Sequence, residues 1–423
     1  MQVALKNFKE KLVNFLRSYR ISTPANAVYL IICVILTSIH ISGNFIWGDQ
    51  HLNDFSSYYY AAKELFQNPL HIYDEAYLAA TYNVYVFRYF PAMLGIIFYP
   101  LTALPLIPAY ALFTVMSYFL NLANIYLAIG IIRKFAKGFN QKVIEIFAAT
   151  MLVLPFWIDF YVSGQISCLL VFVLLLSLRF YLNGREVWGS LLLGLSLVIK
   201  PITFFQIIFI LVSTLLAKNV KTTIKRGILI MLPLIPDALL FLAVPGLLDG
   251  FLRVNFGGSS PAYFSVSFSN FFVALLKIDF MGVFIACLGG SITVGILMLR
   301  KIKDPQQQIL FSFVFGIFGY FLTQTDIWTN QLPLLFPFLL IAAGFLPRFV
   351  DQKRYFALYV IYPAAAEFFN LYFTYGNDAI IPFIPIVSWS LFLMVGYYIL
   401  TVYQINRSDL PITSTIDSIK DAT

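Results

Sequence analysis

Long apolar runs separated by short polar segments make up most of the chain. The first run, 27–47, has about 20 residues, enough for a helix to cross a hydrocarbon core of roughly 30 Å. Further runs lie at 91–106, 109–132, 143–162, 166–182, 187–217, 227–246, 281–299, 307–323, 331–347, 355–374 and 380–404. With 187–217 taken as one long helix, this pattern predicts an all-α fold, a polytopic membrane bundle of about twelve transmembrane helices.

Composition supports a lipid environment for these runs. Hydrophobic residues make up 60 % of the 423 residues and charged residues 11 %, against about 25 % charged residues in soluble domains. The net charge is +8, but the basic residues lie in short loops between apolar runs. This distribution is typical of the positive-inside rule and does not indicate a nucleic-acid partner.

The basic loops also predict an orientation. Clusters at 218–226, 300–303 and 348–354 would face the cytoplasm, so that 47–88, 247–280 and 324–330 face outward. In this topology the basic loop 133–142 faces outward, against the rule. An alternative topology moves that loop inside: 91–106 dips into the membrane without crossing, and 187–217 splits at Lys200-Pro201 into two crossings. Charge favours the alternative, and the family resemblance described below favours the first topology, which we adopt.

Three regions follow from this pattern. Residues 1–26 alternate basic and apolar side chains at helical spacing, which predicts an amphipathic helix on the cytoplasmic leaflet. Residues 27–405 form the transmembrane domain. Residues 406–423 are polar and are predicted to be a disordered cytoplasmic tail.

The outer segment 47–88 holds an unusual number of ionisable side chains for this chain. Asp54 precedes apolar residues at helical spacing, which predicts a helix of about 13 residues ending at Asn68-Pro69. Such a helix is too short to span, so we expect it to lie flat at the outer interface with its tyrosines at headgroup depth. Asp54 and Asp74 are both interpretable as helix N-caps.

Asp54 also has a chemical interpretation. A carboxylate in a partly dry pocket can act as a general base, and a phosphate leaving group needs no acid partner because it departs as a stable anion. Asp49, His51 and Asp54 are each competent metal ligands, but their spacing matches no metal motif. We therefore expect no metal and no cofactor.

Several elements resemble glycosyltransferase family 87, integral membrane enzymes that include polyprenol-phosphate-mannose-dependent mannosyltransferases. The family's D-F-x-x-Y-x-x-A helix is matched by DFSSYYYA at 54–61, and its Y-x-P and P-L-x-x-L-P elements by YFP at 89–91 and PLTALP at 100–105. Gly164-Gln165, a glycine-leucine element within 189–195, and Lys200-Pro201 then follow in the family's order. The resemblance covers residues from about 26 to 347.

This resemblance implies a fold of the GT-C type and metal-independent, inverting transfer of a hexose, mannose above all, from a polyprenyl-phosphate-linked donor to a glycolipid or glycan acceptor. The lipid bilayer would be the third partner, with the active site on the outer face of the plasma membrane. Asp54 would be the catalytic base. The family's W-x-H-H-like element reads WTNQ at 328–331, so amides replace imidazoles there. The candidate substrate-binding residues are Arg88 (for phosphate), Lys200, Gln165, Asn330, Gln331, Tyr58 and Asp49.

Two other classes of function remain open. A transporter or lipid flippase would place paired ionisable groups near the membrane midplane and often shows inverted repeats. Asp159, Lys200, Asp237 and Glu367 are the few intramembrane charges, and no repeat is visible. A non-catalytic scaffold would need Asp54 only as a cap. Lys200 could pair with Asp159 or Asp237 instead of a ligand.

Overall fold

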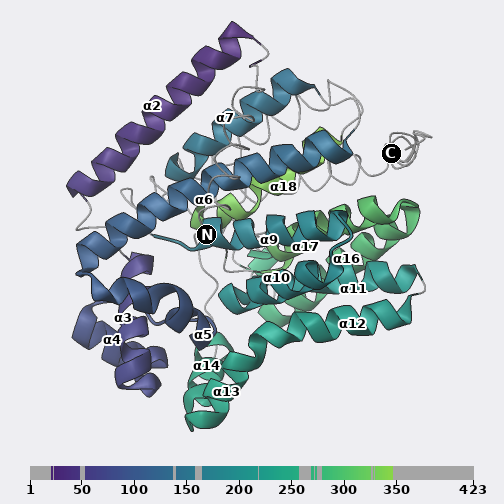
Figure 1. Ribbon diagram of the computed structural model, residues 1–423. Coiled ribbons are helices and arrows are strands. Elements are labelled where there is room, and N and C mark those ends of the chain that lie inside the picture. The colour runs from purple at the N-terminus through teal and green to yellow at the C-terminus, as the bar shows by residue number, and fades with distance from the viewer. Residues whose placement is uncertain are drawn as a thin grey trace, which may run out of the picture.

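The computed structural model describes residues 21, 23–47, 53–136, 140–157, 164–217, 219–256, 268–270, 272–273, 279–324, 327 and 329–345. This part of the chain is helical and contains no strand, so the predicted all-α class is confirmed (Figure 1). The predicted N-terminal helix within 1–26, the last two apolar runs and the tail lie almost entirely outside the described residues, as do Asp49, His51 and Asp159. The count of about twelve crossings therefore stays a prediction.

The first half of the chain forms α2 (Pro24–Trp47), α3 (Asn53–Gln67), η2 (Pro69–Tyr73), α4 (Glu75–Tyr82), α5 (Pro91–Met93), η3 (Leu94–Phe98), η4 (Tyr99–Ala103), α6 (Leu106–Phe135), α7 (Gln141–Trp157), α9 (Ser167–Leu182), α10 (Glu186–Ile199), η5 (Pro201–Thr203) and α11 (Phe204–Leu216). The second half forms α12 (Val220–Met231), η6 (Leu232–Leu234), α13 (Ile235–Ala243), α14 (Leu247–Phe256), α15 (Phe268–Asn270), α16 (Phe280–Lys301), α17 (Pro305–Thr323), η8 (Thr329–Leu334) and α18 (Phe336–Gly344).

Among the described residues, three helical segments are long and apolar enough to cross a membrane. They are Leu106–Phe135, Val220–Ala243 and Met281–Lys301, and the last two are only 17 % buried inside the protein. Their exposed apolar side chains need lipid as a solvent, which agrees with the composition. The first predicted span is also a helix, α2, which runs beside α7 (Figure 1).

The prediction of one long helix over 187–217 is wrong. α10 ends at Ile199 and α11 begins at Phe204, with Lys200 extended between them (φ −154°, ψ 119°). Proline disfavours the helical conformation of the residue before it, so Pro201 forces this break. Arg226 of α12 then contacts both Glu186, in the first turn of α10, and Thr214, near the end of α11. The two helices therefore form a hairpin.

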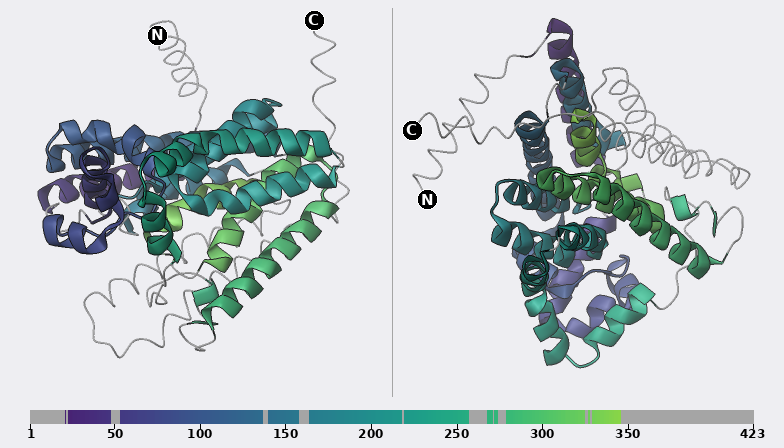
Figure 2. Two further views of the ribbon diagram at one scale, coloured as in Figure 1. Left: turned by 90° about the horizontal axis from the view of Figure 1, so that it is seen from below. Right: turned by 90° about the vertical axis from the view of Figure 1, so that its right-hand side faces the viewer.

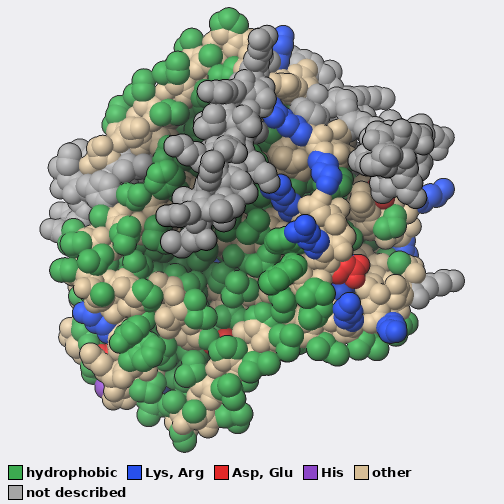
Figure 3. Space-filling model, in the orientation of Figure 1, with side chains coloured by type: hydrophobic (Ala, Val, Ile, Leu, Met, Phe, Trp, Pro, Cys, Tyr) green, Lys and Arg blue, Asp and Glu red, His purple; other side chains and the backbone are tan. Residues whose placement is uncertain are grey.

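The ends of many helices meet at one side of the molecule, which we call the basic end. Lys134 at the end of α6 donates to Asn183 after α9, and Gln306 at the start of α17 donates to the Leu182 carbonyl at 3.5 Å. Arg and Lys side chains gather here, as the blue band on the right of Figure 3 shows. The basic end carries Arg133, Lys134, Arg179, Arg185, Lys225, Arg300 and Lys301.

The opposite side, which we call the α3 end, holds α3, α4 and α14 (Figure 1). The purple helices of this end lie at the left of the left-hand view in Figure 2. Phe55 of α3 packs against Phe98 and against Tyr110 and Phe113 at the start of α6. The segment Pro91–Ala103 is a short apolar helix in three pieces, and α6 follows it directly. The end of α6, with Arg133 and Lys134, therefore lies opposite α3 and beside the other basic residues, as the alternative topology predicts. Which of these segments cross the membrane stays a prediction.

Two of the α3 tyrosines, Tyr58 and Tyr59, are covered by protein and do not face lipid headgroups as predicted. Phe55, Tyr58, Tyr59, Ala61 and Ala62 are all at most 3 % exposed and pack inside the protein. The apolar periodicity that predicted the helix was correct, but the apolar face is covered by η2, η3, η4 and α6 instead of by lipid.

Close approach of α10 and α12 depends on a glycine, which gives a test of the packing of these two helices. A Cβ on Gly194 would lie 2.0 Å from the Ile230 carbonyl oxygen. We expect Gly194→Ala to lower the thermal unfolding midpoint of the detergent-purified protein by about 1–4 °C, since overpacking a backbone contact costs roughly 1–3 kcal/mol. Gly227→Ala on α12 is the control, because a Cβ there meets nothing within 4 Å. Equal midpoints for the two variants would contradict the packing of α10 on α12.

Candidate functional site

Asp54 lies at the start of α3, at the α3 end of the molecule. The helix begins at Asn53, so Asp54 occupies the first turn and not the predicted N-cap position. Its side chain is partly exposed, while its neighbours Phe55, Ser56 and Ser57 are buried. A carboxylate in the first turn is stabilised by the positive end of the helix dipole. The backbone of Asp54 is thus fixed in a buried helix, while its side chain remains accessible.

Most other polar side chains of the segment have structural roles. Glu64 is 2 % exposed and accepts hydrogen bonds from Tyr82 at 2.6 Å and Tyr77 at 3.4 Å. Its second oxygen lies 3.2 Å from Nδ1 of His71, which stacks on Tyr77. Asp74 accepts from the Tyr77 amide at 3.0 Å, so its predicted role as the N-cap of α4 is confirmed. These contacts fasten α3 to the following elements.

Tyr58 connects the Asp54 region to a residue more than a hundred positions away. It lies one turn after Asp54 and donates a hydrogen bond to Oε1 of Gln165 at 3.2 Å. Burial raises the pKa of the Tyr58 phenol well above its usual 10.0, and the charges of Tyr89 and Asp54 raise it further. The phenol therefore stays protonated and remains a donor.

Gly164 makes this contact possible. It has a φ of +70°, which side-chain-bearing residues rarely adopt, and a Cβ there would lie 2.5 Å from the Cβ of Phe55. Only glycine therefore lets the turn before α9 approach the start of α3. The Gly164-Gln165 pair acts as a unit in which the glycine provides the approach and Gln165 provides the polar contact.

Lys200 is the second polar centre. It is 2 % exposed, and its Nζ has no hydrogen-bond partner among the described residues. The ammonium lies 5.2 Å from the centre of the Tyr89 ring, whose own centre is 6.0 Å from that of Tyr58. A cation–π contact returns only about 0.5–2 kcal/mol of the several kcal/mol that burying a charge costs. Lys200 does not form the considered ion pair with Asp237.

The sequence interpretation gave no site role to the residues that hold Tyr89. Its carbonyl accepts from the Tyr73 hydroxyl at 2.7 Å, and the Ala92 amide at the start of α5 donates to Oδ1 of Asp237 at 2.7 Å. Oδ2 of Asp237 is buried without a partner. An isolated acid in an apolar run was the available signal for Asp237, and the Y-x-P element was the signal for Tyr89.

The other candidate residues lie on the segment before α5, in η8 or outside the described residues. Arg88 is exposed on the segment before α5, between buried Phe87 and half-buried Tyr89. Gln331 is buried in η8, where it accepts from Tyr320. Asn330 lies in the same helix, η8. Asp49 is outside the described residues, as is most of the segment 255–272.

The cluster thus runs from Asp54 through Tyr58 and Tyr89 to Lys200, with Gln165 beside Tyr58. The model of one protein family, glycosyltransferase family 87, matches residues 87–325, more than half of the chain. The chain belongs to glycosyltransferase family 87. Of the cluster, Tyr89, Gln165 and Lys200 lie within the matched residues, and Asp54 and Tyr58 precede them. Among curated proteins, none matches the chain.

For a family 87 glycosyltransferase, this arrangement offers two complementary groups. A carboxylate can remove a proton from an acceptor hydroxyl, and a buried cation can stabilise the charge of a leaving group. The aromatic rings of Tyr58 and Tyr89 lie between them, and rings of this kind pack against the apolar faces of sugars and exclude water. No group of three or more potential metal ligands is present among the described residues.

Paired glycines give a matched test of the Gly164 contact. Gly164 and Gly184 have nearly the same φ, +70° and +73°, but a Cβ on Gly184 would meet nothing within 4 Å. Both alanine variants lose roughly 1–2 kcal/mol to backbone strain. We expect Gly164→Ala to unfold at a clearly lower temperature than Gly184→Ala, because only Gly164→Ala also pushes α3 from its position. Equal thermal unfolding of the two purified variants would mean that Gly164 does not set this approach.

Proposed function

We propose that this family 87 protein transfers a hexose from a polyprenyl-phosphate-linked donor to a glycolipid or glycan acceptor, with mannose as the first sugar to test. Asp54 is the proposed general base, and Lys200 is the proposed contact of the donor phosphate. The observation that carries this proposal is the buried ammonium of Lys200. It has no hydrogen-bond partner in the part of the chain that the structure describes, and Tyr89 and Tyr58 join it to the Asp54 region.

The chemistry follows from these two groups. The acceptor oxygen attacks the anomeric carbon, and its proton passes to the Asp54 carboxylate as the bond forms. The bond from the anomeric carbon to the phosphate oxygen breaks, and the phosphate leaves with the electron pair. Attack opposite the leaving group inverts the anomeric configuration. Because the phosphate leaves as an anion, Lys200 can stabilise it by charge alone.

A lipid-linked donor fits the place of Lys200 in the fold. α10 and α11 contain 14 and 13 residues, so each is only about 20 Å long, shorter than a hydrocarbon core of roughly 30 Å. Their junction at Lys200 therefore falls within membrane depth when their other ends lie at the membrane surface. A phosphate on a prenyl chain can reach that depth from the side, whereas a water-soluble nucleotide sugar would have to leave water.

Orientation follows from the charges. The basic end would face the cytoplasm, so Asp54 and α3 would lie on the outer face of the membrane, with the lipid bilayer, donor and acceptor as partners. We assign this arrangement to a GT-C fold in the plasma membrane. Among the other proposed contacts, Gln165 orients Tyr58, whereas Arg88, Asn330 and Gln331 remain candidates for the sugar or acceptor.

The first test removes the carboxylate of the proposed base and leaves the other charged side chains unchanged. We expect Asp54→Asn to lower sugar transfer by a factor of about 10²–10⁴ while the protein still folds, since Asn cannot accept the proton. Transfer is measured with membranes that contain the full chain, polyprenyl-phosphate-mannose and a lipid acceptor extract. Asp74→Asn is the matched control, because Asn is an equally good N-cap and Asp74 serves only α4.

Two results would contradict this assignment. Equal transfer by wild type and Asp54→Asn would leave Asp54 without a catalytic role and direct the search to Asp49. No transfer by any form, with several donor sugars tried, would favour a lipid transporter over a transferase.

Lys200 gives a test in which stability and activity move in opposite directions. Met has nearly the same length without the charge, so Lys200→Met should raise the free energy of unfolding by about 1–3 kcal/mol. The same change should reduce transfer by a factor of about 10²–10³, because the leaving phosphate loses its cation. Thermal unfolding and the transfer assay measure the two effects on one preparation.

Lys63→Met is the matched control for Lys200→Met. Lys63 also lies over a tyrosine ring, with its Nζ 4.7 Å from the centre of Tyr59, but its side chain is only partly buried. Neither stability nor transfer should change much. A Lys200→Met protein that is less stable but fully active would assign Lys200 a structural role.

A further inference from the structure

A cavity at the basic end, far from Asp54, has no role in the proposed reaction. It has a volume of about 530 Å³ and is lined by Gly184, Arg185, Glu186, Val187, Trp188 and Lys225. Pockets of roughly 300–1,000 Å³ are typical of sites for small ligands and lipid headgroups. The size of the cavity therefore suits a small ligand or a lipid headgroup.

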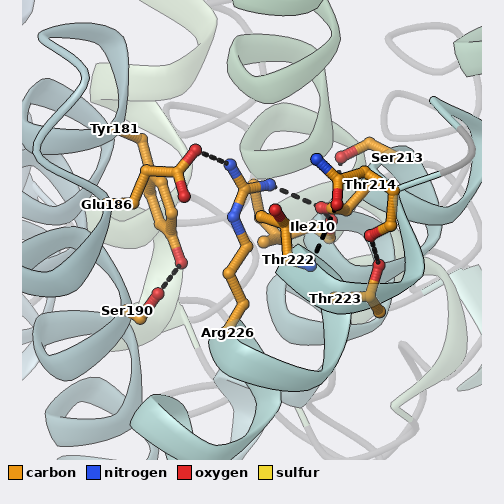
Figure 4. Close-up of polar contacts among 10 residues, drawn as sticks. Tyr181, Glu186, Ser190, Ile210, Ser213, Thr214, Thr222, Thr223 and Arg226 are labelled. Carbon is orange, nitrogen blue, oxygen red and sulfur yellow. Dashed lines mark hydrogen bonds and ion pairs between the residues drawn. The ribbon is translucent and has the colours of Figure 1, made fainter.

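Charge in the cavity is biased towards an anion. Its one carboxylate, Glu186, is held at 2.7 Å by Arg226, as Figure 4 shows. The Arg226 guanidinium is buried, lies 5.2 Å from the Tyr181 ring centre and also donates to Thr214. Glu186 is therefore neutralised from the protein side, which leaves the exposed charges of Arg185 and Lys225 facing the cavity.

The wall of the cavity continues into a lipid-facing surface. Trp188, a residue type that favours the membrane interface, is 59 % exposed. Beside Lys225, α12 and α13 present one apolar stripe with helical spacing. Its members are between 49 % and 81 % exposed: Ile224, Ile228, Met231, Ile235, Leu239 and Leu242. From Ile224 to Ile235 this stripe is about 16 Å long, which matches the depth of one leaflet.

We propose that this cavity, together with the stripe on α12, binds an anionic phospholipid of the leaflet at the basic end. Arg185 and Lys225 contact the lipid phosphate, Trp188 lies at the level of the glycerol backbone, and an acyl chain lies along Ile224, Ile228 and Met231. The lipid would join α10 to α12 at the base of the hairpin that carries Lys200. The site is separate from the donor site, and its occupation does not depend on the transferase proposal.

Native mass spectrometry of the full chain in detergent tests this site by titration with phosphatidylglycerol and phosphatidylcholine. We expect wild type to bind phosphatidylglycerol about tenfold more tightly, since basic side chains near the membrane surface attract anionic lipids. The double variant R185Q/K225Q should lose this preference. The control K221Q/R300Q removes two exposed positive charges from the same end outside the cavity and should keep it.

Three results would overturn the proposal. Equal binding of the two lipids by wild type would remove the charge selectivity. An equal loss in both double variants would show diffuse attraction and no site. Full displacement of phosphatidylglycerol by millimolar glycerol 3-phosphate would assign the cavity to a soluble phosphate compound. Because the readout is lipid binding, none of these results depends on whether sugar transfer occurs.

Discussion

The break between α10 and α11 is the constraint on which the rest of the structure depends. Pro201 holds Lys200 in an extended conformation, so an apolar run of about thirty residues becomes two short helices instead of one long one. The hairpin returns the chain to the basic end, where Arg226 joins the start of α10 to the end of α11. It also leaves the Lys200 ammonium at the tip of the hairpin, beside Tyr89. One proline thus determines both the topology and the position of the buried cation.

Several local features could be predicted from the sequence because they depend on nearby residues. The helix after Asp54 ends at Gln67, as Asn68-Pro69 predicts, and Asp74 caps α4. The run 187–217 could not be assigned in the same way, because apolar periodicity is the same for one long helix and for two helices joined by a turn. The loop charges did indicate the split, since only the topology with two helices over 187–217 moves Arg133 and Lys134 to the side of the other basic residues.

The site itself could be predicted as a set of residues but not as an arrangement. The sequence singled out Asp54, Tyr58, Gln165 and Lys200, and the structure connects them through Tyr89. The Tyr58–Gln165 contact joins residues 107 positions apart, and no periodicity encodes such a pair. The buried face of α3 also could not be predicted, because the sequence of an amphipathic helix does not distinguish a protein neighbour from a lipid neighbour.

Two buried charged side chains, Glu64 and Lys200, differ in their hydrogen bonding. Glu64 is surrounded by Tyr77, Tyr82 and His71, so that the scaffold of α3 is fixed by a complete set of hydrogen bonds. Among the buried charged side chains of the described residues, Lys200 alone has no hydrogen bond. A fold that satisfies Glu64 fully but leaves the Lys200 ammonium without a hydrogen bond loses stability at Lys200. Such a loss is explained when the missing partner is an anion that binds there, because the same charge that destabilises the empty protein then stabilises the complex.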